Sequence, residues 1–460
     1  MTSKFEALGL SHDVLKSIRD LGFSEPSEVQ ERAIPLILAG KNVVAGSKTG
    51  SGKTLAFGAG MIERAVKGKG IQSLVLTPTR ELAEQVKDAI NDYSKYKGLR
   101  ACSIYGGVSM NPQIHNLKRS EIVVATPGRL LDHIRSRTIN LSHVRIVALD
   151  EADIMFDMGF IDDVSTILEQ CKNREQTLLF SATVTEAVHK IVTRYIPTYS
   201  SVEVESYVDS SKLTQVYYDT EDRNKFSLLV HLLREEKGSL VMIFCNTRRN
   251  VDFVANNLKD LGFKSAAIHG GLTQKKRQFM LDKFADEKTR VNVLVCTDVA
   301  GRGIHVDEVS HVFNYDIPKD SKQYVHRVGR TARAGQEGKA INILTSRDHE
   351  NFQKVLRDND VEIEHRDTPR TERVVISWKG DNDRGFGGRN SRNGGGRGRS
   401  GGPGGSRGGG RHGGSSNDRR KSSGASRSHG QARNKGYSRS SSSSGPRTST
   451  SGGNPYIPSN

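Results

Sequence analysis

The chain has 460 residues, and at roughly 150 residues per domain it is too long for a single ordinary domain. Its formal net charge of +17 favours a polyanionic partner, such as nucleic acid or an acidic membrane surface. The segment from Asp381 to the end holds 15 Lys and Arg residues against 3 acids, so most of this charge belongs to the C-terminal tail.

The sequence pattern excludes a membrane span and a zinc or disulfide framework. No stretch approaches the roughly 20 consecutive apolar residues of a membrane helix, and the first ten residues lack the basic and apolar regions of a secretion signal. The four cysteines are far apart in the sequence, which predicts reduced and buried thiols. We therefore expect a cytoplasmic protein that does not engage a membrane.

The first half of the chain alternates short apolar runs with amphipathic stretches. A helix is predicted at residues 82–93, and strands are predicted at residues 42–45, 73–76, 122–125, 146–149 and 177–180. Runs that are apolar throughout indicate strands buried on both faces, and parallel strands need crossovers long enough to contain a helix. This half is therefore predicted to be an α/β domain with a parallel sheet.

The same alternation begins again after a polar stretch near residue 206. A second set of strands is predicted at residues 240–244, 265–268, 291–296, 311–315 and 340–344. The sequence thus predicts two α/β domains in tandem, at residues 33–204 and 214–375. Residues 205–213 are the predicted linker, and residues 1–32 precede the first domain.

From about Gly380 the composition changes to Gly, Ser, Arg and Asn, with almost no aliphatic residues. Such a segment cannot offset its conformational entropy by burial, so we expect residues 376–460 to be a disordered tail. Arg-Gly pairs such as Arg397-Gly398 suit loose contact with RNA, and a neutral spacer is the alternative interpretation.

A Gly-rich turn follows the first predicted strand and opens a helix. Its glycines let backbone N–H groups close around phosphate oxygens, Lys53 reaches the β and γ phosphates, and Thr54 can ligate Mg²⁺. A chance Gly-rich loop is the alternative, but the flanking strand and helix favour a phosphate site. The predicted nucleotide-binding residues are Ser47, Lys48, Thr49, Gly50, Ser51, Gly52, Lys53 and Thr54.

Three acids, Asp150, Glu151 and Asp153, follow the predicted strand at residues 146–149. Carboxylates at the carboxyl end of a buried parallel strand lie beside the phosphate loop. Asp150 is then placed to hold Mg²⁺ through water, and Glu151 to orient and polarise the attacking water. A lone acidic tetrapeptide is usually a solvated turn, and its pairing with Lys53 is what favours catalysis.

In the second half, Arg327, Arg330 and Arg333 stand three residues apart, so on helical spacing they would share one face. A basic run is normally a solvated face. Arginines supplied to a γ-phosphate by a second domain would, however, make hydrolysis depend on domain closure, which couples chemistry to movement.

Together these motifs resemble the DEAD-box RNA helicases of superfamily 2, over residues 5–367 and in the order of that family. The resemblance implies two RecA-like domains and an RNA-stimulated ATPase that unwinds short RNA duplexes locally. It also implies that Gln30 and Phe23 contact adenine, with Phe5 as the isolated upstream aromatic, and that Arg330 and Arg333 act on the γ-phosphate.

The same resemblance implies the other site residues. Those that couple hydrolysis to strand separation are Ser181, Thr183, Asp153, His326 and Arg327. Those that contact the RNA backbone are Pro78, Thr79, Arg80, Gly107, Thr126 and Arg129 in the first domain and Thr247, Gln274, Arg277, Thr297 and Gly301 in the second. Gly303 and His305 are expected at the nucleotide.

Three features depart from the family pattern. Ser47 and Lys48 replace the usual Ala and Gln of the phosphate loop, and Gly271 stands where an Asp commonly follows His-Gly. His305 occupies the position of an Asp that contacts the ATP ribose, and a neutral His offers one acceptor and a weaker bond. We expect a weaker grip on the ribose, with Asp307 as the alternative ribose contact.

The sequence therefore predicts an ATP-dependent RNA helicase that uses ATP and Mg²⁺. It should bind single-stranded and duplex RNA with weak sequence preference, through a monomeric core, and with ribonucleoprotein or ribosome-assembly partners. Three alternatives stay open: an ATP-dependent RNA clamp that barely unwinds, a non-enzymatic RNA-annealing scaffold driven by the tail, and a DNA helicase.

Overall fold

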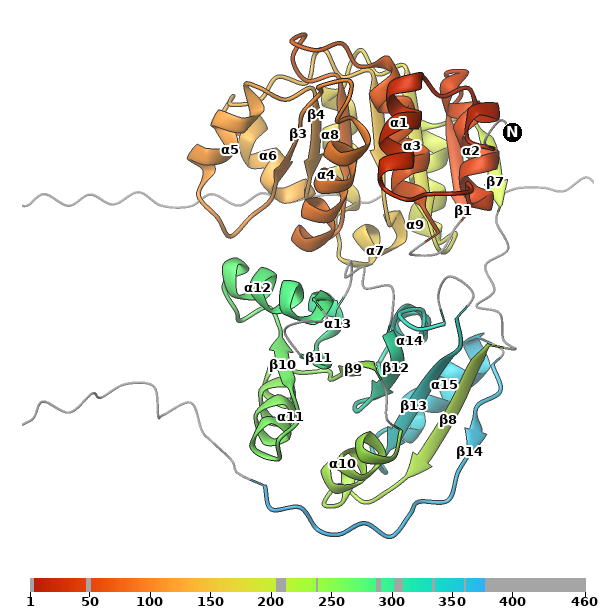
Figure 1. Ribbon diagram of the computed structural model, residues 1–460, viewed down its shortest axis with the longest axis vertical. Coiled ribbons are helices and arrows are strands. Elements are labelled where there is room, and N and C mark those ends of the chain that lie inside the picture. The colour runs from red at the N-terminus through yellow and green to blue at the C-terminus, as the bar shows by residue number, and fades with distance from the viewer. Residues whose placement is uncertain are drawn as a thin grey trace, which may run out of the picture. The chain divides into compact units, whose positions relative to one another are not determined.

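The computed structural model describes residues 4–46, 51–203, 212–236, 239–286, 291–301, 309–332, 336–359 and 361–376. Nearly all of the predicted tail and most of the predicted linker lie outside these residues. The described chain forms two seven-stranded parallel sheets, and helices connect most successive strands (Figure 1). Within this part of the chain, no helix has the length and apolar character needed to cross a membrane.

The first sheet has the strand order β3-β4-β2-β5-β6-β1-β7, and its strands are parallel. The strands are β1 (Val43–Gly46), β2 (Ser73–Leu76), β3 (Ala101–Ile104), β4 (Ile122–Ala125), β5 (Ile146–Leu149), β6 (Gln176–Ser181) and β7 (Ser200–Glu203). The helices are η1 (Glu6–Leu8), α1 (His12–Asp20), α2 (Glu28–Leu38), α3 (Lys53–Arg64), α4 (Arg80–Tyr93), α5 (Met110–Leu117), α6 (Pro127–Arg135), α7 (Ala152–Asp157), α8 (Ile161–Gln170) and α9 (Glu186–Tyr195).

Both faces of this sheet are covered, as the continuous apolar runs predict. Alternate side chains of β2 point to opposite faces: Val75 packs in a core with α1 to α4, whereas Leu74 and Leu76 pack in a second core with α6 to α9. Every residue of β2, β4 and β5 is buried, and each fully buried aliphatic side chain contributes about 1.5–3 kcal/mol. The buried strands hold the loops at their ends in fixed positions.

The second sheet has the order β10-β11-β9-β12-β13-β8-β14, again parallel. Its strands are β8 (Leu213–Asp219), β9 (Leu240–Phe244), β10 (Ser265–Ile268), β11 (Val293–Cys296), β12 (Val309–Asn314), β13 (Gly338–Leu344) and β14 (Glu364–His365). Its helices are α10 (Lys225–Glu235), α11 (Arg248–Asp260), α12 (Gln274–Ala285), α13 (Asp298–Gly301), α14 (Ser321–Val328) and α15 (His349–Asn359). Three core clusters pack on it.

The ten predicted strands are present: five have the predicted limits, and the other five have one or both ends shifted by one or two residues. Strands β3, β7, β8 and β14 were not predicted. The reason is that none has a continuous apolar run: Ser103 interrupts β3, β7 has one apolar residue, polar residues interrupt β8, and β14 is two residues long. Residue 213, predicted as the end of the linker, begins β8.

Candidate nucleotide and RNA site

The predicted site residues of the first domain gather at the carboxyl edge of its sheet. The phosphate turn follows β1, the acidic motif follows β5, and Ser181 ends β6. Parallel strands end at one edge, so segments distant in sequence come together there. Of the turn, residues 47–50 lie outside the described chain, and so do Gly303, His305 and Asp307 of the second domain.

Lys53 begins α3 directly after Gly52, whose φ is +85°, a conformation that glycine adopts freely. A Cβ on Gly52 would collide with the Gln30 side-chain amide, so the turn packs closely against α2. The Lys53 side chain is buried, and its Nζ lies 3.7 Å from Asp150 Oδ1. Burial raises the pKa of Asp150 to about 6, although Lys53 opposes this shift. The segments that follow β1 and β5 thus place an ammonium beside a carboxylate.

Glu151 is strained and buried. Its φ is +49°, in the left-handed region that non-glycine residues rarely adopt, and its exposure is 2%. Among the described residues, neither Glu151 carboxylate oxygen has a hydrogen-bond partner, and neither does Lys53 Nζ. Buried charged groups of this kind are costly unless something pairs with them. Phosphate oxygens and an attacking water would supply those partners, so the residues fit ATP.

Of the predicted adenine-binding residues, Gln30 lies in the first turn of α2 and Phe23 precedes that helix. Gln30 is buried: its Oε1 accepts from Ser27 N–H at 3.0 Å, and its Nε2 donates to the Gly52 carbonyl at 3.0 Å. Ser27 Oγ also donates to the Ser51 carbonyl at 2.7 Å, so this capping box is bonded to the phosphate turn. Phe23 is 43% exposed, and its ring centroid lies 6.4 Å from that of Tyr93.

Asp153 joins the acidic motif to the segment after β6. Its Oδ2 accepts from Thr183 N–H at 3.0 Å and from Thr183 Oγ1 at 2.9 Å, and its own N–H donates to Ser181 Oγ at 3.2 Å. His326 Nε2 of the second domain lies 3.8 Å from Oδ2. Burial raises the pKa of Asp153, but His326, Thr183 and Lys53 outweigh it and hold that pKa at about 2. Asp153 is therefore an ionised hub.

Arg327 forms a second buried hub. Its guanidinium donates to Asp298 Oδ1 at 2.5 Å and Oδ2 at 2.7 Å, and also to Asn246 Oδ1, Asn314 Oδ1 and the Asp316 carbonyl. The predicted single helical face of three arginines is wrong, because α14 ends at Val328 and Arg330 lies beyond it.

Arg330 is buried, and its Nε donates to the His326 carbonyl at 3.2 Å. Arg333 lies outside the described residues.

The first-domain residues expected at RNA lie on three neighbouring loops. Thr79 caps α4 by accepting from Leu82 N–H, and Pro78 and Arg80 flank it. Gly107, after β3, has a φ of +82°, and a Cβ there would collide with the Arg80 guanidinium. Arg129 lies in the first turn of α6, which begins at Pro127 after Thr126, and its Nη1 donates to the Val108 carbonyl at 3.0 Å. The contacts of Arg80 and Arg129 thereby bring the loops after β2, β3 and β4 together.

In the second domain, Thr247 caps α11 by accepting from Asn250 N–H. The Thr297 carbonyl accepts from Gly301 N–H at 2.7 Å, where a larger residue would meet Phe244 and Cys296. Gln274 and Arg277 both bind Glu81 of the first domain, each at 2.8 Å.

Two family models match the chain: DEAD/DEAH box helicase over residues 27–191 and helicase conserved C-terminal domain over residues 224–335. The ATP-dependent RNA helicase CshA of Listeria monocytogenes is 42% identical over 349 residues, covering 75% of this chain and 67% of CshA. The chain belongs to the DEAD-box RNA helicase family. The DEAD-box ATP-dependent RNA helicase CshA of Bacillus subtilis is also 42% identical, over 76% of this chain and 71% of its own.

Among solved structures, Saccharomyces cerevisiae Dbp5 bound to RNA and ADP BeF3 matches this DEAD-box chain with a TM-score of 0.72 and 31% identity. The match covers 80% of this chain and 96% of the Dbp5 chain. The predicted family, the tandem RecA-like fold and the activity of an ATP-dependent RNA helicase are confirmed.

Sequence reasoning about this DEAD-box chain missed several partners in the site. No role was predicted for Ser27, Glu81 or Asp298, although each binds a predicted site residue. A signal was present for Asp298, an acid that stands two residues after a buried strand of the second domain, as Asp150 stands directly after one in the first. No signal in the sequence links Glu81 to Arg277, because they are almost two hundred residues apart.

Proposed function

We propose that this DEAD-box helicase binds ATP with Mg²⁺ at the carboxyl edge of the first sheet. Two buried hubs, around Asp153 and Arg327, then couple hydrolysis to local opening of short RNA duplexes. The observation that carries the proposal is the pair of buried charged groups, Lys53 Nζ and the Glu151 carboxylate, that have no hydrogen-bond partner within the described residues.

The nucleotide chemistry follows from these side chains. Lys53 binds the β and γ phosphates, and Glu151 orients and polarises the attacking water. No group of three or more His, Cys, Asp or Glu residues in the described chain can hold a metal, so Thr54 and Asp150 would hold Mg²⁺ together with phosphate oxygens. Bound Mg²⁺ would neutralise the charge that develops on those oxygens.

The coupling role rests on contacts that link the acidic motif to other segments. Asp153 binds Thr183 and Ser181 within the first domain, so a shift of the acidic motif moves the segment after β6. Arg327 connects the segments after β9, β11 and β12 of the second domain through Asn246, Asp298 and Asp316. Arg330 and Arg333 then stabilise charge on the γ-phosphate.

RNA is bound through its backbone by Arg80, Arg129 and the loops that contain them, so sequence preference is weak. A monomeric core, a cytoplasmic location and ribonucleoprotein partners stay predictions.

The proposal is tested with Glu151→Gln, which keeps the size of the side chain but removes the charge that activates water. Hydrolysis in a single turnover should fall by about 10²–10⁴-fold, while ATP affinity changes little. Glu186→Gln is the matched control, because it removes the same charge from an exposed residue on α9. If Glu151→Gln hydrolyses ATP at the parent rate, the role given to Glu151 is wrong.

A further inference from the structure

The amino-terminal edge of the first sheet, opposite the nucleotide site, carries an unusual concentration of positive charge. Five loops lead into β2 to β6 and form this basic edge: residues 65–72, 94–100, 118–121, 136–145 and 171–175. They contain eleven Lys and Arg residues against two acids, Glu121 and Glu175. In the second domain, the segments that lead into β9 to β13 contain seven Lys and Arg residues against six acids. The excess is therefore specific to the first domain.

Most of these cations face solvent without an acidic partner. Lys67, Lys69, Lys118, Arg119 and Lys172 are exposed, and no ion pair joins any of them to an acid of the described chain. Glu121 is buried, and its carboxylate accepts hydrogen bonds from the backbone N–H groups of residues 68 and 100. Glu175 pairs with Arg145 of the edge, and two further edge cations, Lys95 and Lys97, pair with Asp20 and Glu63. The acids therefore neutralise a minority of the eleven cations.

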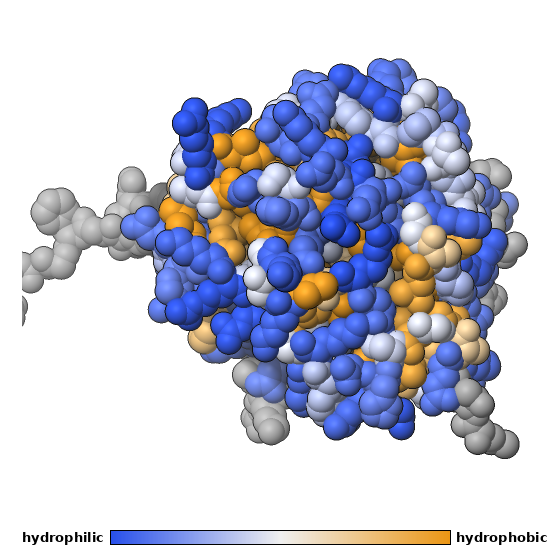
Figure 2. Space-filling view, turned by 90° about the horizontal axis from the view of Figure 1, so that it is seen from above, coloured by the Kyte–Doolittle hydropathy of each residue, from blue (hydrophilic) through white to orange (hydrophobic). Residues whose placement is uncertain are grey.

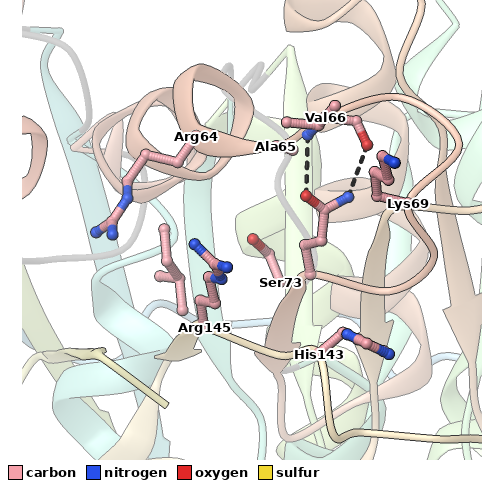
Figure 3. A pocket seen from close by; sticks show the side chains of 9 residues that line it. Arg64, Ala65, Val66, Lys69, Ser73, His143 and Arg145 are labelled. Atoms are coloured by element: carbon pink, nitrogen blue, oxygen red, sulfur yellow. Dashed lines mark hydrogen bonds between the residues drawn. The ribbon is translucent and has the colours of Figure 1, made fainter. Parts of the chain in front are cut away.

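The edge is also hollowed. A depression of about 370 Å³ is lined by Arg64, Lys69, His143 and Arg145 (Figure 3). A second depression, of about 420 Å³, shares His143 and Arg145 with the first and adds Lys172 and Arg174.

A third depression, of about 260 Å³, is lined by Lys67, Arg100, Lys118 and Arg119. Viewed from above, hydrophilic residues dominate this face of the molecule, with apolar patches between them (Figure 2).

These observations point to a polyanion. Cations outnumber acids in the lining of each depression, since Glu121 lines the third and Glu175 lines the second. Surfaces with such an excess of positive charge concentrate anions, and the nucleotide site does not use them because ligands of parallel sheets bind at the carboxyl edge. Protein partners are anchored by buried aromatic and large apolar groups, whereas phosphate backbones are held by Lys and Arg. Of the large apolar side chains in the five loops, Val66 is the one that is more than a third exposed, at 55%. That composition favours a phosphate backbone over an acidic protein.

We propose that the basic edge is a second RNA-binding surface, which holds the sugar-phosphate backbone of RNA that flanks the helicase site. This second surface goes beyond the proposed function, because no residue of the basic edge binds nucleotide or couples hydrolysis to unwinding. Strands β2, β4 and β5 have four residues each and span about 13 Å, and the 14-residue α4 beside them spans about 21 Å. RNA of a few tens of nucleotides that leaves the helicase site is therefore long enough to reach the opposite edge.

The test is a triple variant of the full chain, Lys69→Gln, Lys118→Gln and Lys172→Gln, with one substitution at each depression. Binding is measured over a range of salt with two single-stranded RNAs, of about ten and about forty nucleotides. Three lost phosphate contacts lower the salt slope by about 2 units on the long RNA, so the parent loses about fifteen-fold more affinity than the variant between 50 and 200 mM salt. The short RNA should show no change in slope.

The matched control neutralises three other lysines of the described helices, by Lys190→Gln, Lys259→Gln and Lys354→Gln, with the same loss of charge. This control should keep the parent slope on both RNAs. An unchanged slope of the test variant on the long RNA overturns the proposal. If that variant instead loses affinity for polyglutamate while its RNA binding is unchanged, the edge binds an acidic protein, and the proposal is likewise overturned.

A second readout does not depend on a variant. Acetylation of Lys69, Lys118 and Lys172 in the parent should slow several-fold in the presence of the long RNA and stay unchanged with the short one. Equal reactivity with both RNAs contradicts the proposal. Loss of ATP hydrolysis by Glu151→Gln tests the helicase site separately, so the two proposals fail independently.

Discussion

Thr183→Val removes one hydroxyl from the Asp153 hub and tests how the hub couples hydrolysis to unwinding. In the parent, Asp153 Oδ2 accepts from Thr183 Oγ1 at 2.9 Å and from Thr183 N–H at 3.0 Å. Valine has nearly the same shape, so the backbone donor stays and the hydroxyl donor is lost. Asp153 is 1% exposed, and water cannot readily replace the missing donor.

The magnitude follows from the charge on Asp153. Hydrogen bonds to charged groups contribute about 1.5–3 kcal/mol each, so Thr183→Val should lower the free energy of unfolding of the first domain by about that amount. The loss also loosens the segment after β6 from the acidic motif. We expect ATP hydrolysis within a few-fold of the parent and a fall of about ten-fold or more in duplexes opened per ATP hydrolysed.

The assay measures urea unfolding, RNA-stimulated ATP hydrolysis and release of a short RNA duplex in the same preparations. Thr185→Ala is the matched control: Thr185 caps α9 by accepting from Val188 N–H, and loss of such a cap costs about 1 kcal/mol. The control should lose stability but keep the parent number of duplexes opened per ATP. If both variants are impaired equally in opening, or neither is, the coupling role of Asp153 and Thr183 is refuted.

Three further predictions concern other parts of the molecule. Asp298→Asn leaves the buried Arg327 without its carboxylate and should lower the free energy of unfolding, measured with urea, by about 3–5 kcal/mol. The control Asp222→Asn breaks an exposed pair with Arg347 and should lower it by at most about 1 kcal/mol. An equal cost would contradict the burial argument. Burial and the nearby Arg129 lower the pKa of His133, so the native state disfavours its protonation. The free energy of unfolding should therefore fall as the pH drops below the usual histidine pKa near 6.5. His133→Gln should remove part of the fall in thermal midpoint between pH 7.5 and pH 5.5. A pH dependence identical to that of the parent would exclude this contribution. Truncation at residue 380 removes 12 net positive charges, and if a third of them contact single-stranded RNA the salt slope of binding should decrease by roughly 3 units. An unchanged slope would mean that the tail is a spacer.

Much of the fold could be predicted because its central strands are buried on both faces. Residues 73–76, 122–125, 146–149, 240–244 and 265–268 were predicted as strands and have those limits in the structure. Strand β8 was missed because its buried and partly exposed positions alternate, which hides it among polar segments.

The site could be predicted where a motif fixes its own local geometry. Lys53 and Asp150 follow two buried strands, so their approach at one sheet edge follows from the fold. The row of arginines could not be predicted from spacing, because Gly329 follows the last turn of α14 and the Arg327 guanidinium is drawn into the Asp298 pair. Such pairings depend on tertiary contacts between distant segments, and spacing within one motif does not reveal them.

The most direct test of the account is release of a labelled strand from a short RNA duplex by the full chain, with ATP and with no nucleotide. The account predicts release that requires ATP, that is lost in Glu151→Gln, and that is retained in Glu186→Gln. Release without ATP would support an annealing scaffold, and ATP hydrolysis without release would support an RNA clamp. Equal release of a DNA duplex would support a DNA helicase. Each of these results would contradict ATP-driven opening of RNA at this site.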